Sequence, residues 1–421
     1  MRLVCGSCQM EAAGNGETLP CARCGDVLEI RLDVKESPPA AARFQFRARL
    51  SSALPRERSG VWRFRELLPG FDDAEIVSLG EGNAPEMAGK RASAWSELQR
   101  LQFKLLGLNP TGSYKDAGMT VAVTRARSIG ASILACASTG NTGASLAVYA
   151  ARAGLRAVVL LPEGQVTAAK LAQTQDAGAK VFSISGDFDS AMAEVRALAL
   201  RNLVYPVNSL NPYRREGQKT VAFEILEQRG WRAPDWVIVP GGNLGHCVSL
   251  GKGFEEARAL GLSDRVPRIA VVQAAGAAPF VRAFSDDAPL RPIRAKTFAS
   301  AIQIGNPVSW RAALRVLHAT GGTAIAVDDE SIAHARAILA RDGLACEPAS
   351  AASLAGASSL RAKQIIRPED DVVAILTGSS LKDSAHIAEY HGDASRPLSN
   401  PVHLVGSDSE SLERALFAGI V

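Results

Sequence analysis

The sequence has neither a long apolar run nor a strong excess of one charge, and it contains few cysteines for its length. No apolar run reaches the ~18 residues that a membrane-spanning helix needs, and the N-terminal segment MRLVCGSCQM has no signal-peptide core. Seven cysteines in 421 residues do not suggest a disulfide framework, so we expect a reducing, cytoplasmic compartment. The net charge of +4 does not argue for nucleic acid or an anionic membrane as partner, but it leaves room for a local basic pocket that binds a phosphorylated substrate.

The composition is that of an ordinary soluble globular protein with more than one domain. Apolar residues make up 47% of the chain and charged residues 21%, which is enough apolar material for a sizeable core. At about 150 residues per domain, the length predicts two or three domains.

Four of the cysteines form two pairs near the N-terminus, Cys5-x-x-Cys8 and Cys21-x-x-Cys24. Each pair can form a tight turn whose sulfurs face one ion, and two pairs give the four-thiolate site that suits structural Zn(II). We therefore expect Cys5, Cys8, Cys21 and Cys24 to bind zinc in a small ribbon-like module, which also contains a strand at Val27–Leu32. A set of free thiols is the alternative.

Residues 36–60 are rich in Pro, Ala and Arg, and we interpret them as a linker followed by a helix. From about residue 100 to residue 390, short apolar runs alternate with longer helical stretches, which predicts parallel sheets with helices on both faces. The expected strands are Leu101–Leu106, Ser132–Ala137, Arg156–Leu161, Lys180–Ile184, Trp236–Val239, Arg268–Gln273, Gly322–Val327 and Val372–Leu376. The expected helices are Met119–Ser128, Ala144–Ala153, Phe188–Arg201, Val248–Leu260 and Ile332–Asp342, with a short amphipathic helix near the C-terminus.

The segment NPTGSYKDAG, residues 109–118, lies between an expected strand and an expected helix, and it contains Lys115. The positive end of a helix dipole lowers the pKa of an amine placed there. A neutral, partly desolvated amine is what imine formation with an aldehyde requires. An isolated Lys-Asp pair would more often be an ordinary surface lysine, but the complete string is more specific.

Three more loops follow expected strands. The segment ASTGNTG, residues 137–143, exposes backbone N–H groups at a helix start, which suits a carboxylate, although a capped turn would look similar. The segment PGGNLG, residues 240–245, suits a phosphate monoester, since it lacks both the Walker A lysine and the dinucleotide fingerprint. In LTGSSLKD, residues 376–383, Thr377 would stand at the carboxyl end of the sheet, where its hydroxyl can bond a heteroaromatic nitrogen.

Together these strings resemble the fold-type II pyridoxal-phosphate (PLP) enzymes, and most closely the threonine synthase family. That family has S-F-K-D-R-G-M around its lysine, and this chain has S-Y-K-D-A-G-M at residues 113–119. Further strings of the family have counterparts at residues 78–85, 211–220, 304–310 and 347–353, in family order. The chain departs from the family pattern at Ala84, Ala117 and Ser380, which stand where the family has Thr, Arg and Gly. The four-cysteine ribbon resembles an extension found on some members.

The resemblance implies a role for each matching residue. Lys115 holds PLP as a Schiff base and acts as the catalytic base. The cofactor is bound by Asn141 at its phenolic oxygen, by Thr377 at its ring nitrogen, and at its phosphate by Gly241, Gly242, Asn243, Leu244 and Gly245. The substrate, O-phospho-L-homoserine, is bound by Ser138, Thr139, Thr142, Asn208 and Arg214.

The fold class that we expect is α/β, a two-domain fold-type II PLP enzyme similar to the tryptophan synthase β chain. The expected parts are a ribbon (1–35), a linker and the start of the large domain (36–100), a small domain carrying the lysine (101–210) and a large domain carrying the phosphate loop (211–421). The expected partners are a small phosphorylated amino acid and a second copy of the chain in a homodimer.

The function implied is that of a lyase that converts O-phospho-L-homoserine and water to L-threonine and phosphate. The nearest alternatives are other fold-type II activities, namely a threonine or serine dehydratase or a synthase that uses phosphoserine. A catalytically silent protein that uses the ribbon to bind RNA or protein is an alternative of another class. A NAD-dependent dehydrogenase is disfavoured because the dinucleotide fingerprint is missing.

Overall fold

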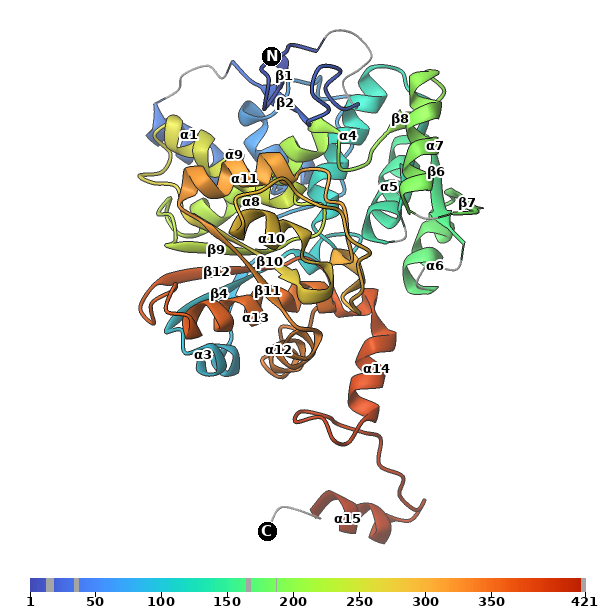
Figure 1. Cartoon of the computed structure of the whole chain (residues 1–421), viewed down its shortest axis with the longest axis vertical. Helices are drawn as coiled ribbons and strands as arrows, with labels where there is room; N and C mark the ends of the chain where they lie inside the picture. Colours follow the sequence, from blue (N-terminus) through green and yellow to red (C-terminus); the bar gives the residue numbers. More distant parts are fainter. Residues whose placement is uncertain (13–18, 34–37, 139, 164–167, 187, 418–421) are drawn as a thin grey trace.

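The computed structural model describes residues 1–12, 19–33, 38–138, 140–163, 168–186 and 188–417, and two sheets form its frame (Figure 1). The larger sheet has the strand order β11-β10-β9-β12-β4-β3, in which every pair is parallel except β3 with β4. Its strands are β3 (Glu86–Ala88), β4 (Arg100–Leu105), β9 (Trp236–Pro240), β10 (Arg268–Ala274), β11 (Thr323–Val327) and β12 (Asp371–Leu376).

The smaller sheet is parallel throughout, with the strand order β7-β6-β5-β8. Its strands are β5 (Ile133–Ala137), β6 (Arg156–Pro162), β7 (Lys180–Ile184) and β8 (Tyr205–Pro206). Alternate residues of β5 face opposite cores, because Leu134 and Cys136 pack on one side of the sheet and Ala135 and Ala137 on the other.

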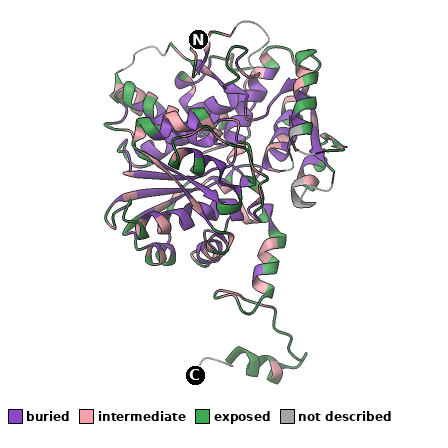
Figure 2. Cartoon of the chain, in the orientation of Figure 1, coloured by how far each residue is buried: buried purple, intermediate pink, exposed green. Residues whose placement is uncertain are grey.

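Helices cover both faces of each sheet, as the βαβα rhythm predicts. On the larger sheet, Figure 1 shows α3 (Lys90–Ser96), α12 (Asp329–Arg341) and α13 (Pro348–Ala362) below, and α8 (Pro212–Gln228), α9 (Gly245–Ala259) and α11 (Trp310–Thr320) above. The smaller sheet packs against α5 (Asn141–Ala153) and α7 (Phe188–Leu200), and α4 (Lys115–Ser128) packs on both α5 and α8. Figure 2 shows that the central strands and the inward faces of these helices are buried, so each sheet has its own core.

The strand predictions are confirmed to within one or two residues, but the sheet to which β4 belongs differs from expectation. We placed residues 101–106 in the small domain, whereas β4 pairs with β12 in the larger sheet. Sequence periodicity describes a strand but not its long-range partner, so it cannot assign a strand to a sheet. The stretch at 36–60 also contains a better-defined helix than expected, α1 (Pro39–Arg49), whose Phe46 packs on Phe64 and Trp231 at ring-centroid distances of 5.1 and 6.0 Å.

The helix α8 was not predicted from periodicity, because it is buried on all sides from Pro212 to Leu226. Its start is fixed by Asn211, whose side chain accepts from two backbone N–H groups of the first turn, and by the proline that follows. Several of the charged residues inside this packing form ion pairs. Lys104 on β4 lies 2.9 Å from Glu224 of α8. Such pairs join α8 to the larger sheet and to α9.

The N-terminal module contains a two-stranded antiparallel sheet of β1 (Arg2–Cys5) and β2 (Leu28–Arg31), and β2 is the strand expected at Val27–Leu32. The module lies on α8, α9 and α11, and each of these helices contributes a cation to the contact. Arg215 donates to the Leu28 carbonyl, Lys252 to the Ile30 carbonyl, and Arg315 to the carboxylate of Asp26 at 3.1 Å. The module is therefore docked on the body of the protein.

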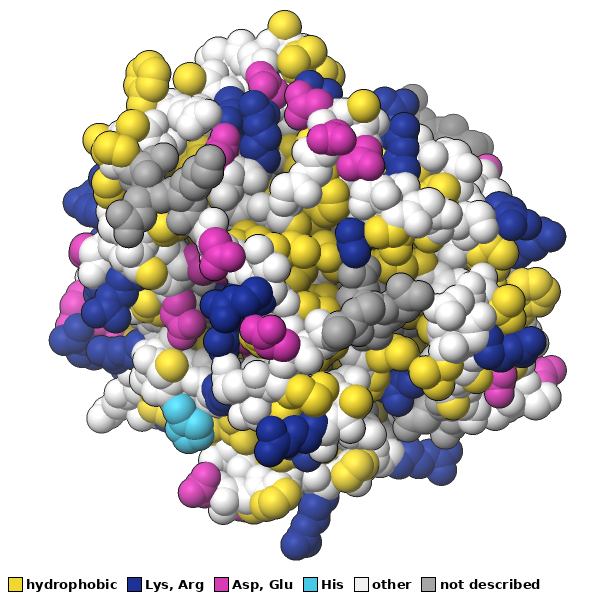
Figure 3. Space-filling view, turned by 90° about the horizontal axis from the view of Figure 1, so that it is seen from above, with side chains coloured by type: hydrophobic (Ala, Val, Ile, Leu, Met, Phe, Trp, Pro, Cys, Tyr) yellow, Lys and Arg dark blue, Asp and Glu magenta, His cyan; other side chains and the backbone are white. Residues whose placement is uncertain are grey.

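The remaining helices are α2 (Pro55–Arg58), α6 (Ala168–Asp176), α10 (Pro279–Ser285), α14 (Ser384–Gly392) and α15 (Ser409–Phe417). The last two extend away from the body at the C-terminal end (Figure 1). Among the described residues, the search for a helix long and apolar enough to cross a bilayer finds none. Basic and acidic side chains are interspersed on the face that Figure 3 shows, which matches the small net charge.

Candidate active site

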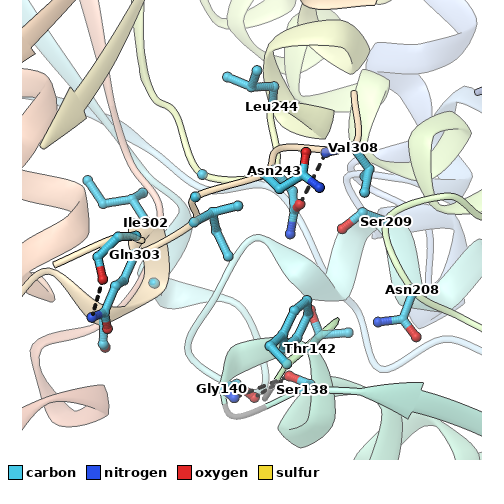
Figure 4. A pocket seen from close by; sticks show the side chains of 18 of the residues that line it. Ser138, Gly140, Thr142, Asn208, Ser209, Asn243, Leu244, Ile302, Gln303 and Val308 are labelled. Atoms are coloured by element: carbon cyan, nitrogen blue, oxygen red, sulfur yellow. Dashed lines mark hydrogen bonds between the residues drawn. The ribbon is translucent and has the colours of Figure 1, made fainter. Parts of the chain in front are cut away.

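A cavity of about 1500 Å³ is lined by loops from both sheets, at the carboxyl ends of their strands (Figure 4). In Figure 4, Ser138, Gly140 and Thr142 lie on one side of the pocket, and Asn243, Leu244 and Val308 lie across from them. The predicted site residues that line the cavity are Lys115, Ser138, Asn141, Thr142, Asn208, Gly242, Asn243, Leu244 and Thr377. Gly241, Gly245 and Arg214 are not part of the lining, and Thr139 lies outside the described residues.

The lysine-bearing turn is held by the buried carboxylate of Asp116. This carboxylate accepts from the Thr111 backbone N–H at 2.7 Å, from the Thr111 hydroxyl at 2.6 Å and from the Ser145 hydroxyl of α5 at 2.6 Å. Burial raises the pKa of Asp116 to about 6, although these hydrogen bonds act in the opposite direction. The turn is also joined to the end of β12, because the Tyr114 N–H donates to the Thr377 carbonyl at 2.9 Å. Lys115 and Thr377 are thereby placed beside the same cavity.

Lys115 begins α4 and reaches the aromatic ring that precedes it. Its Nζ donates to the Tyr114 hydroxyl and lies 4.0 Å from the centroid of that ring. Tyr114 also contacts His246, whose ring stacks on it at a centroid distance of 4.3 Å and an angle of 11°. Burial, and then the charge of Lys115, lowers the pKa of His246 to about 3. The stack therefore joins the lysine turn to the first turn of α9 through a neutral imidazole.

The glycine loop before α9 allows other groups to approach its backbone closely. The Gly241 N–H donates to the Val272 carbonyl at 2.7 Å, which ties the loop to β10. A Cβ on Gly242 would lie 3.1 Å from the Ala301 carbonyl, so a side chain there would crowd the cavity wall. Leu244 has a left-handed backbone with φ of 66°, and α9 begins at the next residue. Because the first N–H groups of a helix have no intrahelical acceptor, this end of α9 suits an anion.

The loop at residues 137–143 leads into α5, and its polar side chains differ in the hydrogen bonds that they make within the protein. The Ser138 hydroxyl accepts from the Gly140 N–H at 3.2 Å and the Gly143 N–H at 3.1 Å, so it caps the helix as well as lining the cavity. The Asn141 amide donates to both carboxylate oxygens of Glu347, at 3.0 and 3.1 Å. Its Oδ1 is buried and has no hydrogen-bond partner among the described residues.

The two residues expected to bind the substrate phosphate lie at different depths. Asn208 lines the cavity, but its amide also pairs with the backbone N–H and carbonyl of Ala137, at 3.0 and 2.8 Å. Arg214 is buried, and its Nη1 donates to the Val207 carbonyl at 2.9 Å. Its Nε has no partner in the described part of the chain, and burial lowers its pKa. A buried cation that is incompletely satisfied suits an anionic ligand.

Several residues that the motifs did not single out also line the cavity. Tyr114 and Glu347 lie within the family strings, and Ser209 directly follows Asn208, so their neighbours could have drawn attention to them. His246 directly follows the glycine loop. The cations at the cavity, other than Lys115, belong to no motif and could not be found from the sequence: Arg196, Arg294 and Lys296. Ala84 and Ala117, two of the departures from the family pattern, are buried in the core and do not line the cavity.

The four N-terminal cysteines converge as expected. Their ligand atoms all lie within 4.8 Å of one another, and the closest sulfur pairs are Cys5 with Cys24 at 3.3 Å and Cys8 with Cys21 at 3.6 Å. Four sulfurs at about 2.3 Å from a tetrahedral zinc ion would be about 3.8 Å apart. The described cysteines are free thiols, so this cluster is compatible with a metal site.

The sequence of the chain matches one class of enzyme. The sequence profile of the family described as "Pyridoxal-phosphate dependent enzyme" matches residues 77–378, the region that carries all of the cavity loops. Two related proteins narrow this class of enzyme to one family. The chain is 45% identical to the threonine synthase of Methanocaldococcus jannaschii over 87% of its own length and 89% of the relative's, and 42% identical to that of Methanosarcina acetivorans over 90% and 92%. The chain therefore belongs to the threonine synthase family of PLP-dependent enzymes.

Solved structures agree on the fold. The threonine synthase of Escherichia coli superposes with a TM-score of 0.71 at 19% identity, covering 99% of this chain and all of that one. A maize serine racemase superposes with a TM-score of 0.62 at 19% identity, over 80% of this chain and 93% of the other. At such identities the likeness shows the fold alone, which is the fold-type II arrangement that the sequence predicted.

The titration of His246 gives a prediction for the pH dependence of stability. Its pKa is about 3 in the folded chain against an ordinary 6.5, so the folded state binds fewer protons across that window. Stability should therefore fall as the pH falls from 7 to 5, by about 2 kcal/mol from this residue. The variant His246→Phe keeps a ring against Tyr114 but cannot titrate. Denaturation midpoints at the two pH values should show a smaller loss for the variant, and equal losses would contradict this assignment.

Proposed function

We propose that the chain is a PLP-dependent lyase that converts O-phospho-L-homoserine and water to L-threonine and phosphate. The observation that carries the proposal is that Lys115 and the glycine loop of α9 line one cavity, in a chain 42–45% identical to threonine synthases over most of its length. The identity covers both sheets, so it favours this activity over the dehydratase and phosphoserine alternatives.

The polar groups of the cavity fit PLP. Lys115 supplies an amine for the aldehyde, Thr377 a hydroxyl, and the loop at Gly241–Gly245 the start of a helix. Asn141 supplies an amide oxygen that has no hydrogen-bond partner among the described residues. In this proposal Asn141 holds the phenolic oxygen, Thr377 holds the ring nitrogen, and the loop with Asn243 and Leu244 holds the phosphate. When bound, PLP supplies a conjugated ring that stores the charge left on a deprotonated substrate carbon.

The chain's own residues orient the substrate and move its protons. The amine of Lys115 takes the proton from the α-carbon, a second proton leaves the β-carbon, and phosphate departs from the γ-carbon. Water adds its hydroxyl at the β-carbon and its proton goes to the phosphate, and the two removed protons are replaced by protons at the γ-carbon and the α-carbon. The loop that opens α5, with Ser138 and Thr142, holds the substrate carboxylate. Fixing the carboxylate and the phosphate at two points leaves one Cα bond free to align with the ring, which is an orientation effect.

The substrate phosphate is assigned to Asn208, which lines the cavity together with Ser209, and to Arg214, which is buried and not part of the lining. Arg214 supports this role because its guanidinium is buried and its Nε lacks a partner among the described residues. A guanidinium binds phosphate oxygens through paired N–H groups, and a buried one does so with little competition from water.

The four-cysteine cluster is assigned to a structural zinc ion held by Cys5, Cys8, Cys21 and Cys24. The sulfur spacings support this assignment, and four protein ligands leave no open position for catalysis. Because the module is docked through cations of α8, α9 and α11, the ion would stabilise that docking rather than take part in the reaction.

The role of Lys115 can be tested against another lysine of the same cavity. Lys115→Ala should abolish the visible absorbance of lysine-bound PLP and the release of phosphate from O-phospho-L-homoserine. Lys296→Ala also removes an amine from the cavity lining but should keep the absorbance band. Turnover by Lys115→Ala without that band would refute the assignment.

The phosphate role of Arg214 predicts a change in substrate preference. Arg214→Ala should lower kcat/KM for O-phospho-L-homoserine by about 100-fold, as expected for the loss of a charged hydrogen-bond donor. Deamination of serine or threonine, which carry no phosphate, should fall much less. The matched control is Arg215→Ala, which removes an equally buried guanidinium that bonds the Leu28 carbonyl of the ribbon instead. Equal losses on both kinds of substrate would argue against a phosphate role.

The zinc assignment predicts one zinc ion per chain by elemental analysis of protein purified without chelators. Cys8→Ser should lower the zinc content and the thermal midpoint, because the ion loses a thiolate. Cys247→Ala removes a buried thiol outside the cluster and should keep the zinc. Zinc content that is unchanged in Cys8→Ser would contradict a four-thiolate site.

A further inference from the structure

The start of α13 carries two buried polar residues, Glu347 and Ser350, to which no role has yet been assigned, and Glu347 lines the cavity. Glu347 precedes the helix and Ser350 lies one turn further, and both are buried, at 1% and 0% exposure. The Ser350 N–H donates to the Glu347 carbonyl at 3.0 Å, so the two side chains are held in a fixed relation. Each of them bonds a different residue assigned to the cofactor.

Glu347 bonds Asn141. Both carboxylate oxygens accept from the Asn141 amide, at 3.0 and 3.1 Å. A carboxylate oxygen without a proton only accepts, whereas an amide has a donor end and an acceptor end that can exchange by rotation. The contact therefore fixes which end of Asn141 faces Glu347 and leaves the buried Oδ1 directed elsewhere, without a partner among the described residues. Gly378 makes room for this contact, because a Cβ there would lie 2.3 Å from Glu347 Oε1.

Ser350 bonds Thr377. The Ser350 Oγ accepts from the Gly378 N–H at 2.9 Å and lies 2.9 Å from the Thr377 Oγ1. The only other acceptor for the Ser350 hydrogen among the recorded contacts is the Gly378 carbonyl, at a longer 3.4 Å. The shorter contact favours donation to Thr377. Thr377 then keeps its own hydrogen for a group in the cavity.

We propose that Glu347 and Ser350 are positioning residues that fix the rotation of Asn141 and Thr377 toward two polar atoms of the cofactor ring. The inference rests on the proposed function, since it takes the two partners as ligands of PLP. One helix turn then sets the hydrogen bonds of both Asn141 and Thr377 to the PLP ring. The ring is therefore oriented by α13, although none of the predicted PLP ligands lies on α13. With its amide nitrogen held by Glu347, Asn141 presents an oxygen that can only accept, so it bonds the phenolic oxygen when that oxygen carries its hydrogen. Free rotation of Asn141 would turn its NH2 end toward that O–H group instead.

The test is a pair of double-mutant cycles read by equilibrium PLP binding and by the pH titration of the visible absorbance. Glu347→Gln keeps the side-chain volume but can present either end of its own amide, so it should weaken PLP binding about tenfold and shift the titration midpoint. In an Asn141→Ala background, the same change should alter binding by less than about twofold, because the group that it orients is gone. Ser350→Ala should behave in the same way relative to Thr377→Ala.

Ser353→Ala is the matched control, because Ser353 is equally buried on α13 and its hydroxyl bonds only the Ser350 carbonyl among the recorded contacts. It should leave PLP binding and the titration midpoint unchanged. Additive losses in both cycles would overturn the inference and make Glu347 and Ser350 direct ligands or general structural residues. Failure of the unmodified protein to bind PLP at Lys115 would instead overturn the proposed function, so the two failures are distinguishable.

Discussion

The buried carboxylate of Asp116 is the contact on which the rest of the site depends. It accepts three hydrogen bonds, from the backbone and side chain of Thr111 and from Ser145 of α5, and so joins the lysine turn to a helix of the smaller sheet. The same turn bonds the end of β12 in the larger sheet. Because both sheets direct the carboxyl ends of their strands at this point, one turn determines how the two halves of the cavity meet.

Much of this arrangement follows from local sequence pattern. Apolar runs located the strands closely; β7, for example, has the expected bounds Lys180–Ile184. The loops at residues 137–143 and 240–245 could be placed at helix starts because small residues follow each strand, and both line the cavity. The local sequence pattern was sufficient to predict those elements whose structure depends on residues close by in the sequence.

Where the local sequence pattern did not predict the structure, the missing information concerns contacts between residues that are far apart in the chain. The burial of α8 on all sides removes the periodicity that marks a helix with one exposed face. The membership of β4 in the larger sheet depends on its pairing with β12, some 270 residues away. Likewise, the contact of Glu347 with Asn141 joins residues far apart in the chain. The docking of the ribbon depends on cations of three helices, of which only Arg215 lies in a family string.

The central claim is that Lys115 is the amine that binds the cofactor covalently in this cavity. Borohydride reduction of the PLP-loaded protein, followed by peptide mapping with mass spectrometry, tests it directly. We expect a phosphopyridoxyl group on the peptide that contains Lys115 and none on Lys296, the other lysine of the cavity lining. A group attached at Lys296, or no attached group after loading, would contradict it.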